Sequence, residues 1–372
     1  MEIKPFGVEM WMNEFETQCE LNLAETCVDS ITLGQLLEMA GKGNSVLDEL
    51  LPMRLGYGDI EGSPRLRDVI AALYKKQARE NVLVCHGTIG ANALVHQALV
   101  SRGDHVVAVV PTYQQHYSIP ESIGAEVALL QLRAEQNYLP DLAALKTMLR
   151  PTTKLIAINN PNNPTGALMD AAMLSEIAAI ARSVGAWVLC DEVYRGTDQT
   201  GDGFTASMAD LYEKGISTAG MSKAYSLAGL RLGWIVAPRE VLEAAMIHRD
   251  YNTISVGRID DHLAALALEH RDKILARAHR ITRDNLAILS AWVDGEKHIS
   301  WVKPKSGTTA LLKFDLPISS RDFCIKLLEE EGVMFTPGSV MEMEGTLRIG
   351  YACGTEVLQQ GLARVSRFLA RR

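Results

Sequence analysis

The sequence predicts an α/β fold, with a large domain built on a mostly parallel sheet covered by helices and a smaller α+β domain. Two observations predict it. Between residues 63 and 240, short apolar runs rich in β-branched residues alternate with segments that carry apolar residues at helical spacing. After Ala237 this alternation gives way to a long helical stretch and a mixed tail. Apolar strands linked by helices are typical of a parallel sheet buried on both faces.

The predicted strands of the large domain are short and largely apolar: Asn81–Cys85, His105–Val110, Leu155–Asn159, Trp187–Cys190 and Leu232–Val236. The predicted helices are Leu66–Lys75, Ala91–Leu99, Asp141–Leu149 and Ala172–Ser183. In sheets of this kind, ligands bind beyond the carboxyl ends of the strands. Polar side chains that follow these strands are therefore candidates for a site.

The remainder of the chain predicts the smaller domain. A helical stretch from His248 to Val293 is interrupted near Ser255–Gly257, and the tail contains two strands and two helices: Thr308–Leu312, Thr346–Ile349, Ser320–Glu331 and Thr355–Leu369. We expect three parts. Residues 1–50 are a segment that joins the small domain, residues 51–250 the large domain, and residues 251–372 a linking helix and the small domain.

Composition excludes several classes of protein. The net charge of −8 argues against a nucleic-acid partner, which favours a basic surface. No apolar run approaches the roughly 18 residues needed to cross a membrane, and the N-terminus has no apolar signal region. The six cysteines include no C-x-x-C pair, which favours free thiols over disulfides or a metal site. We expect a cytoplasmic protein that binds neither membrane nor metal.

Lys223 and Arg231 stand out as candidates for chemistry. A lone lysine is usually a solvated surface charge, but Lys223 lies between a strand-like run and a glycine-rich one, and Arg231 follows eight residues later. A lysine in a partly desolvated site beside cations keeps a neutral amine part of the time, as a Schiff base requires. Arg231 offers a bidentate fork to a phosphate.

The segment Ser222–Trp234 resembles the cofactor-lysine motif of the fold-type I, class I/II aminotransferases, which use pyridoxal 5′-phosphate (PLP). Four other segments resemble motifs of that family in the same order: Tyr57–Arg67, Asn160–Gly166, Asp191–Tyr194 and Arg348–Gly350. Each match is weak alone, but five in order are hard to obtain by chance. The resemblance implies the fold-type I PLP-dependent transferase fold, with Lys223 holding the cofactor as a Schiff base.

The resemblance also implies roles around the cofactor ring. Asp191 would pair with the pyridinium nitrogen and keep it protonated, although an aspartate there is also a plausible helix N-cap. Asn163 and Tyr194 would donate hydrogen bonds to the phenolic oxygen O3′. Asn before Pro is also a common turn starter. Tyr113 would stack on the pyridine face, and an isolated tyrosine at that spacing is otherwise typical of a core.

The phosphate site is expected where a strand leads into a helix, at Gly87, Thr88 and Ile89. Backbone N–H groups at a helix N-terminus suit a phosphate, although glycine-rich turns of this kind are also common structurally. The resemblance adds Ser222 and Arg231 to this site.

Two further positions bear on the phosphate. Tyr57 matches a tyrosine that the family contributes from the neighbouring subunit, which implies a homodimer. Gly220 departs from the family pattern, because a serine or threonine that touches the phosphate usually lies three residues before the lysine. We expect backbone, Ser222 or water to replace that hydroxyl.

Arg348 matches the arginine that clamps the substrate α-carboxylate, and Asn163 would lie beside the substrate as well. A bidentate clamp aligns the Cα–H bond with the π system of the cofactor. Lys223, once displaced by the substrate amine, would shuttle the proton between Cα and C4′. The implied reaction is transamination between an L-amino acid and a 2-oxo acid, through an external aldimine and a quinonoid.

The N-terminal segment carries information about the substrate. Glu20–Glu25 resembles the PLP-dependent arginine oxidases, and residues 249–351 resemble capreomycidine synthase. In the oxidases, acidic residues of this segment meet the guanidinium, and Glu14 and Glu25 fall at or near those positions. This favours a basic donor such as arginine. Glu14 on a solvated helix face and Glu25 capping a turn are the structural alternatives.

Other classes of function fit less well. A regulatory protein of this fold would carry an appended DNA-binding domain, but the residues before Tyr57 are few and not basic. A non-catalytic scaffold should have lost Lys223 or Asp191, and both are present. The alternative within the enzymes is an arginine oxidase or hydroxylase, or a cyclase that resembles capreomycidine synthase.

Overall fold

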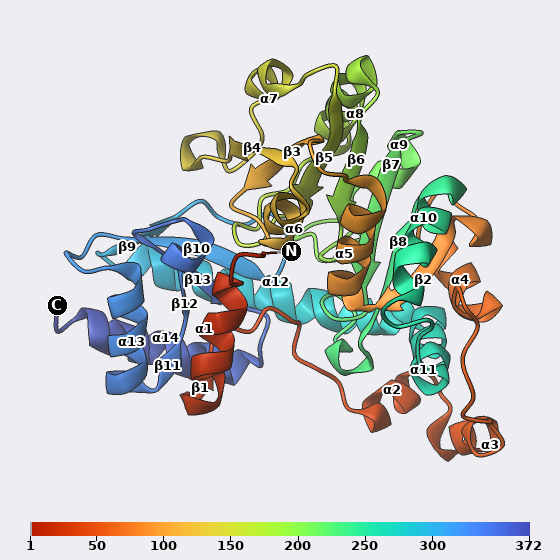
Figure 1. Cartoon of the computed structure of the whole chain (residues 1–372). Coiled ribbons are helices and arrows are strands. Elements are labelled where there is room, and N and C mark those ends of the chain that lie inside the picture. Colours follow the sequence, from red (N-terminus) through yellow and green to blue (C-terminus); the bar gives the residue numbers. More distant parts are fainter. Residues whose placement is uncertain (1) are drawn as a thin grey trace.

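The computed structural model describes residues 2–372, and its largest element is a seven-stranded sheet with helices packed against it (Figure 1). The strand order is β2-β8-β7-β6-β5-β3-β4. Only β8 runs antiparallel to its neighbours. The strands are β2 (Val82–His86), β3 (His105–Val110), β4 (Glu126–Gln131), β5 (Thr153–Asn159), β6 (Trp187–Asp191), β7 (Gly215–Gly220) and β8 (Leu232–Val236). The predicted mostly parallel sheet is confirmed.

Two of these strands were not predicted. β4 lies at the edge of the sheet and is largely exposed, so it lacks the continuous apolar run that marks its neighbours. β7 is fully buried, but its sequence GISTAG consists mainly of small residues. Small side chains suit this strand because α5 packs across it, and they carry little β signal.

Within residues 2–372, six helices accompany the large sheet. They are α4 (Pro64–Ala71), α5 (Gly87–Leu99), α6 (Gln115–Ile123), α7 (Leu142–Met148), α8 (Ala171–Val184) and α9 (Met208–Leu211). The helix α4 precedes the first strand of the sheet, β2, and the other five connect successive strands from β2 to β7. α5 begins directly after β2 and packs against β2, β8 and β7. Its N-terminus therefore lies at the carboxyl edge of the sheet, where the predicted site residues converge.

The predicted long helical stretch consists of three helices: α10 (Arg239–Asp250), α11 (Arg258–Glu269) and α12 (Arg271–Gly295). The break between α10 and α11 was predicted, whereas the break at His270 was not. α12 runs from the large sheet region towards the smaller sheets (Figure 1). Two further short helices, α2 (Leu33–Met39) and α3 (Val46–Leu50), lie near α11 at the outer side of the molecule (Figure 1).

Two small sheets accompany the C-terminal third. Their strands are β1 (Leu21–Asn22), β9 (Ile299–Trp301), β10 (Thr309–Phe314), β11 (Val333–Met334), β12 (Thr336–Pro337) and β13 (Thr346–Gly350). β1 pairs in parallel with β11, and the other four form an antiparallel sheet of order β12-β13-β10-β9. α13 (Ser320–Glu331) and α14 (Thr355–Leu369) have the bounds that their sequences predicted.

The N-terminal segment packs with this C-terminal region. α1 (Gly7–Phe15) contributes Trp11, and the following strand contributes Leu21, to a core that includes Phe323 and Phe368. In Figure 1 α1 lies beside β12 and β13. The division of the chain at residues 50 and 250 stays a prediction.

Three general features accompany the fold. None of the helices within residues 2–372 is long and apolar enough to span a membrane. The same residues contain no group of three or more His, Cys, Asp or Glu side chains placed to hold a metal. All six cysteines are free, and four of them are buried.

Candidate active site

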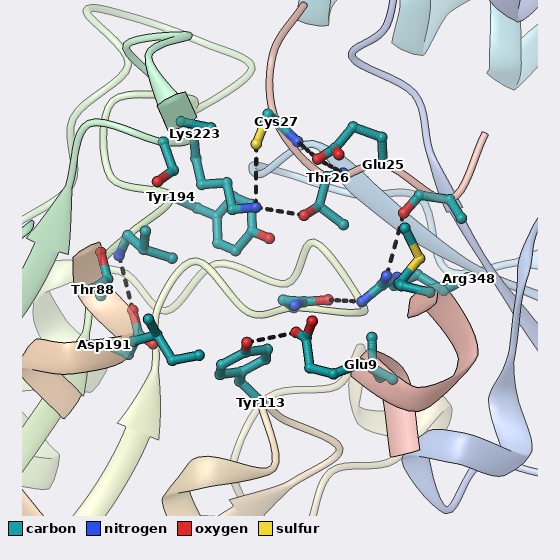
Figure 2. Close-up of a pocket in the computed structure, with 18 of the residues that line it drawn as sticks. Glu9, Glu25, Thr26, Cys27, Thr88, Tyr113, Asp191, Tyr194, Lys223 and Arg348 are labelled. Carbon is teal, nitrogen blue, oxygen red and sulfur yellow. Dashed lines mark hydrogen bonds between the residues drawn. The ribbon is translucent and has the colours of Figure 1, made fainter. Parts of the chain in front are cut away.

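A pocket of about 340 Å³ opens at the carboxyl ends of the central strands, between the large sheet, α1 and β13 (Figure 2). Its lining includes eleven of the predicted site residues: Glu25, Thr88, Ile89, Tyr113, Asn163, Asp191, Tyr194, Ser222, Lys223, Arg231 and Arg348. Gly87 lies directly beside Arg231 at the same end of the pocket. Glu14 and Tyr57 do not line it.

Asp191 is held at the end of β6 by a buried network. Its Oδ2 accepts hydrogen bonds from Asn92 Nδ2 at 2.8 Å and from His116 Nε2 at 3.3 Å, and its Oδ1 accepts from the backbone N–H of Val193 at 3.0 Å. The Nδ1 of His116 lies 3.4 Å from Nε2 of His96. Burial lowers the pKa of His96 well below its usual value, so this ring is neutral. The network fixes the plane of the Asp191 carboxylate.

Lys223 follows β7 and reaches across the pocket. Its Nζ donates to Thr26 Oγ1 at 2.6 Å and to Cys27 Sγ at 3.5 Å, and lies 5.9 Å from the centre of the Tyr194 ring. Burial lowers the pKa of Lys223, but its neighbours Tyr194, Cys27 and Glu25 outweigh burial and raise the pKa above the usual value. Without a carbonyl partner, the amine is therefore an ammonium.

The N-terminus of α5 forms one end of the pocket. A Cβ added at Gly87, where φ is +64°, would lie 3.0 Å from Arg231 Nη2, so the guanidinium lies directly against this turn. Thr88 Oγ1 is buried and has no hydrogen-bond partner among residues 2–372. A helix N-terminus, a guanidinium and an unpaired hydroxyl together fit a phosphate group.

Gly220 is explained by the same turn. A Cβ at this position would lie 2.6 Å from Thr88 Oγ1 and 2.9 Å from the carbonyl oxygen of Leu232. The Thr88 side chain thus occupies the space that a serine or threonine at position 220 would need. The unpaired hydroxyl that the site offers comes from Thr88, a replacement that the sequence did not reveal.

Arg348 lies in β13 and is almost fully buried. Its Nη1 donates to Asn163 Oδ1 at 3.3 Å, and its Nη2 donates to the carbonyl oxygen of Ala24 at 3.3 Å and to Thr336 Oγ1 at 3.2 Å. Its Nε has no partner among the described residues. These long bonds and the free N–H leave the guanidinium able to receive a carboxylate.

Tyr113 links the pocket floor to α1. Its hydroxyl donates to Glu9 Oε1 at 2.7 Å (Figure 2). Its ring packs against Phe6, with the centroids 4.7 Å apart. Burial, and then the charge of Glu9, raises the pKa of the Tyr113 hydroxyl far above its usual value. The position of the Tyr113 ring is therefore set both by its own backbone after β3 and by its contacts with Phe6 and Glu9 of the N-terminal segment.

Acidic side chains line the pocket from the N-terminal segment. Glu9 and Glu16 do so from α1 and the turn that follows it, and Glu25 from the loop after β1. Burial raises the pKa of Glu16, and the charges of Glu25 and Glu9 add to this effect. Glu9, Glu16 and Glu25 are therefore close enough for their carboxylates to repel one another, and a bound cationic group would reduce this repulsion.

Glu25 fulfils both of the alternatives that the sequence left open. Its Oε1 accepts from the backbone N–H groups of Thr26 at 2.7 Å and Cys27 at 2.8 Å, which caps the turn, and the side chain also lines the pocket. Burial raises its pKa, but the Lys223 charge and these N–H bonds lower it more, so the overall shift is downward. Glu25 is an ionised carboxylate.

Glu14 is not brought into the pocket. Its exposed carboxylate pairs with Arg321 at 3.4 Å. Helical geometry explains the placement. Glu9 and Glu16 are seven residues apart and share a face, whereas Glu14 is five residues from Glu9 and points elsewhere. Glu9 and Glu16 were missed, although their i, i+7 spacing in an amphipathic segment could have indicated them.

Tyr57 lies in an exposed loop, with 79% of its surface accessible. It does not line the pocket of its own chain. Its neighbours include other exposed apolar side chains, among them Leu55 and Ile60. This loop contacts the start of α11, since Arg258 donates to the carbonyl oxygen of Arg54 at 2.9 Å.

The family model for aminotransferase class I and II matches residues 39–365. The chain belongs to this family. Capreomycidine synthase from Streptomyces vinaceus is 31% identical over 362 residues, which cover 96% of the chain and 92% of the relative. The arginine–pyruvate transaminase AruH of Pseudomonas aeruginosa is 25% identical over 340 residues, which cover 87% and 84%.

Solved structures give the same family. A PLP-dependent aminotransferase from Streptococcus suis is 42% identical, with a TM-score of 0.97, and the match covers 100% of the chain and 99% of that protein. The PLP-dependent cyclase OrfR is 26% identical, with a TM-score of 0.92, and the match covers 100% and 98%. The aminotransferase is thus a PLP enzyme of fold type I, as the sequence indicated. The anion-binding turn, Asp191 and Lys223 fit that cofactor.

Proposed function

We propose that this aminotransferase takes a basic L-amino acid, such as arginine, as its amino donor and a 2-oxo acid as acceptor. The observation that carries the proposal is the placement of Glu9, Glu16 and Glu25 in the same pocket as Lys223 and Arg348. Similarity to AruH, an arginine–pyruvate transaminase, supports it.

We assign the cofactor site as follows. Lys223 would carry PLP, Asp191 would pair with its ring nitrogen, Asn163 and Tyr194 would donate hydrogen bonds to its O3′, and Tyr113 would stack on its ring. The turn from Gly87 to Ile89, with Ser222 and Arg231, binds the phosphate, and Thr88 supplies the hydroxyl contact. PLP, when bound, withdraws electrons from the substrate Cα and so acidifies its proton.

The chain's own residues then position the substrate and move a proton. Arg348 binds the α-carboxylate through its guanidinium and orients the Cα–H bond towards Lys223. The amine of Lys223, when free of the cofactor, would accept the proton from Cα and deliver it to C4′. The buried network around Asp191 keeps that carboxylate in one orientation throughout.

The acidic side chains select the donor. A cationic side chain relieves the repulsion among Glu9, Glu16 and Glu25 and forms charge-assisted hydrogen bonds. An anionic side chain adds to that repulsion, and an apolar one does nothing to relieve it. Glu25 offers only part of its carboxylate, because Oε1 already accepts two backbone N–H groups.

We further propose a cytoplasmic homodimer. The phosphate end of the pocket is open, since Arg231 and Ile89 are exposed, and Tyr57 of a second subunit could close it. Two segments of the chain also carry exposed apolar side chains, as expected of an interface: Leu51, Leu55 and Tyr57 in one, and Tyr251, Ile254 and Ile259 in the other. The free thiols support a reducing compartment.

A second candidate is an oxidase, hydroxylase or cyclase acting on arginine or a derivative. Similarity to capreomycidine synthase and to the cyclase OrfR favours it. The residues named above would serve that chemistry equally well up to the loss of the Cα proton, so the pocket does not distinguish the two outcomes.

A panel of amino acids, each supplied with and without a 2-oxo acid, tests both candidates. The cofactor absorbance reports the amine form, and an oxygen electrode reports O2 uptake. The aminotransferase is supported if arginine alone gives the amine form and if arginine is consumed continuously only when a 2-oxo acid is present. O2 uptake, or a cyclic product without an acceptor, supports the second candidate. A preference for aspartate or glutamate contradicts the basic-donor proposal.

A further inference from the structure

The Lys223 amine is held by a part of the chain far from it in sequence. The two hydrogen bonds of its Nζ within residues 2–372 go to consecutive residues of the N-terminal segment, Thr26 and Cys27 (Figure 2). The bond to Thr26 Oγ1 is short, at 2.6 Å, whereas the contact with the Cys27 sulfur is a weak one at 3.5 Å. Thr26 therefore dominates the orientation of the amine.

The Thr26 backbone is fixed on both sides. Its N–H donates to Glu25 Oε1 at 2.7 Å, and its carbonyl oxygen accepts from the hydroxyl of Thr308 at 2.6 Å. Thr308 is fully buried. A residue tied down in this way presents its hydroxyl at a defined point, so the contact with Lys223 is built into the fold.

The segment is also in register with the strand that carries Arg348. The N–H of Gly350 donates to the carbonyl oxygen of Leu23 at 2.7 Å, and a Cβ at Gly350 would lie only 1.7 Å from the carbonyl oxygen of Glu25. Arg348 itself donates to the carbonyl oxygen of Ala24. Thr26, which contacts the Lys223 amine, and Arg348 are therefore tied together by the same contacts between residues 23–25 and β13.

We propose that Thr26 is a positioning residue, which holds the Lys223 amine, once it is free of the cofactor, where it can move the proton at the substrate Cα. The inference rests on the proposed role of Lys223. A threonine hydroxyl accepts a hydrogen bond from an ammonium and donates one to a neutral amine. It therefore can hold Lys223 both before and after proton transfer, and it adds no charge of its own beside the amine.

The other groups that face the amine do not replace Thr26. Burial raises the pKa of the Cys27 thiol to about 11, so it stays neutral, and Glu25 directs its Oε1 to backbone N–H groups. Tyr194 presents its ring to Nζ. Loss of the Thr26 hydroxyl would leave Lys223 with its charge neighbours but without its one short hydrogen bond.

The first test compares Thr26→Val, which keeps the shape, with Thr26→Ser, which keeps the hydroxyl. In the holoenzyme we expect kcat to fall about tenfold in Thr26→Val, an effect of misplaced orientation, with KM changed less than about twofold. A donor deuterated at Cα should show a larger isotope effect on kcat in this variant. Thr26→Ser should restore both values towards wild type.

The second test does not depend on turnover. In apo-protein, reductive methylation of Lys223 with formaldehyde and cyanoborohydride at pH 8, followed by mass spectrometry, reports the fraction of neutral amine. Removing a hydrogen bond to the charged form lowers the pKa of the lysine. Methylation should be about threefold or more faster in Thr26→Val than in wild type or Thr26→Ser, with surface lysines as the internal control.

The outcomes separate this inference from the proposed function. If borohydride fixes the cofactor on a lysine other than Lys223, the proposed function fails. If the cofactor is on Lys223 but Thr26→Val matches wild type in isotope effect and methylation rate, the positioning role is overturned. Thr26→Ala gives the same comparison if the valine variant does not fold, and thermal unfolding of each variant checks its integrity.

Discussion

The two ends of the pocket are built in different ways. The end that we assign to the cofactor is formed by strand ends and the start of α5, and Asp191 there is buried within a network of Asn92 and His116. The end formed by the N-terminal segment carries Glu9 and Glu16 on a helix and turn near the surface. One end is determined by many contacts at once, and the other by few.

This difference indicates which substitutions should affect activity with all substrates and which should affect only the choice of amino donor. Breaking a buried charge pair costs about 3 to 5 kcal/mol, whereas an exposed pair contributes about 0 to 1 kcal/mol. Substitutions at the buried end should therefore lower the activity of the enzyme with every substrate. Substitutions at the exposed end should change the ranking of donors while leaving the chemistry intact.

The largest effect is expected for Lys223→Ala. Both the covalent attachment of PLP and the proton transfer are lost, so kcat should fall at least about a thousandfold, within the range for general acid–base catalysis. Steady-state assays with saturating PLP measure the loss, and borohydride reduction with peptide mass spectrometry shows whether the adduct disappears. An adduct that persists on another lysine would contradict the assignment.

Arg348→Gln should have the second largest effect. The buried guanidinium is the proposed partner of the substrate carboxylate, and loss of one member of such a pair costs about 2 to 5 kcal/mol, or roughly 30- to 4,000-fold in kcat/KM. The effect should be the same for basic and neutral donors, because every α-amino acid has the carboxylate. A loss confined to basic donors would place Arg348 elsewhere in the mechanism.

Tyr57→Phe tests whether the open phosphate end is completed by a second subunit. We expect PLP affinity to weaken by about 1 to 2 kcal/mol, as for a hydrogen bond to a charged group. Equilibrium dialysis measures the affinity, and sedimentation measures the dimer. Wild-type PLP affinity in this variant, or a monomeric wild-type protein, would refute the shared site.

The smallest effect is expected for the acidic rim, by which we mean Glu9 and Glu16 at the N-terminal end of the pocket. Glu16→Gln should raise KM for arginine by about fivefold, or about 1 kcal/mol after allowance for solvent screening, and should spare alanine. Glu14→Gln, on the outer face of α1, is the matched control and should change neither value. If the two variants behave alike, the rim does not select the donor.

The same rim predicts a pH dependence. The raised pKa of Glu16 means that its carboxylate is protonated at a higher pH than an ordinary glutamate, whose pKa is about 4.3. The preference for arginine over alanine should therefore decline as pH falls towards that raised value, earlier than an unperturbed carboxylate would cause. Glu16→Gln should remove this part of the pH dependence.

The contrast also explains what the sequence could predict. Strands with continuous apolar runs, such as β3, and the helices α13 and α14 were located from periodicity, because burial on defined faces dictates those patterns. The edge strand β4 and the small-residue strand β7 lack such patterns. Their positions follow from neighbouring strands and from α5, which periodicity does not describe.

The site divides in the same way. The residues that follow strand ends, such as Asn163 and Asp191, were found because local motifs carry them. Asn92 and His116 lie inside helices, where their polar character is an isolated signal, and only the fold brings them to Asp191. The sequence pointed to Glu14, whereas Glu9 and Glu16 line the pocket. A short resemblance does not define which face of a helix meets the pocket.

The close approach of Gly220 to Thr88 has a consequence for reading families of this kind. The Thr88 hydroxyl fills the space beside Gly220, although the two residues are 132 positions apart in the chain. Gly220→Ser would press its Cβ against Thr88 Oγ1 and also against the carbonyl oxygen of Leu232, so adding Thr88→Gly would relieve only the first of these two contacts. A motif that scores each position separately will count Gly220 as a defect, although Thr88 offers an unpaired hydroxyl at the same site.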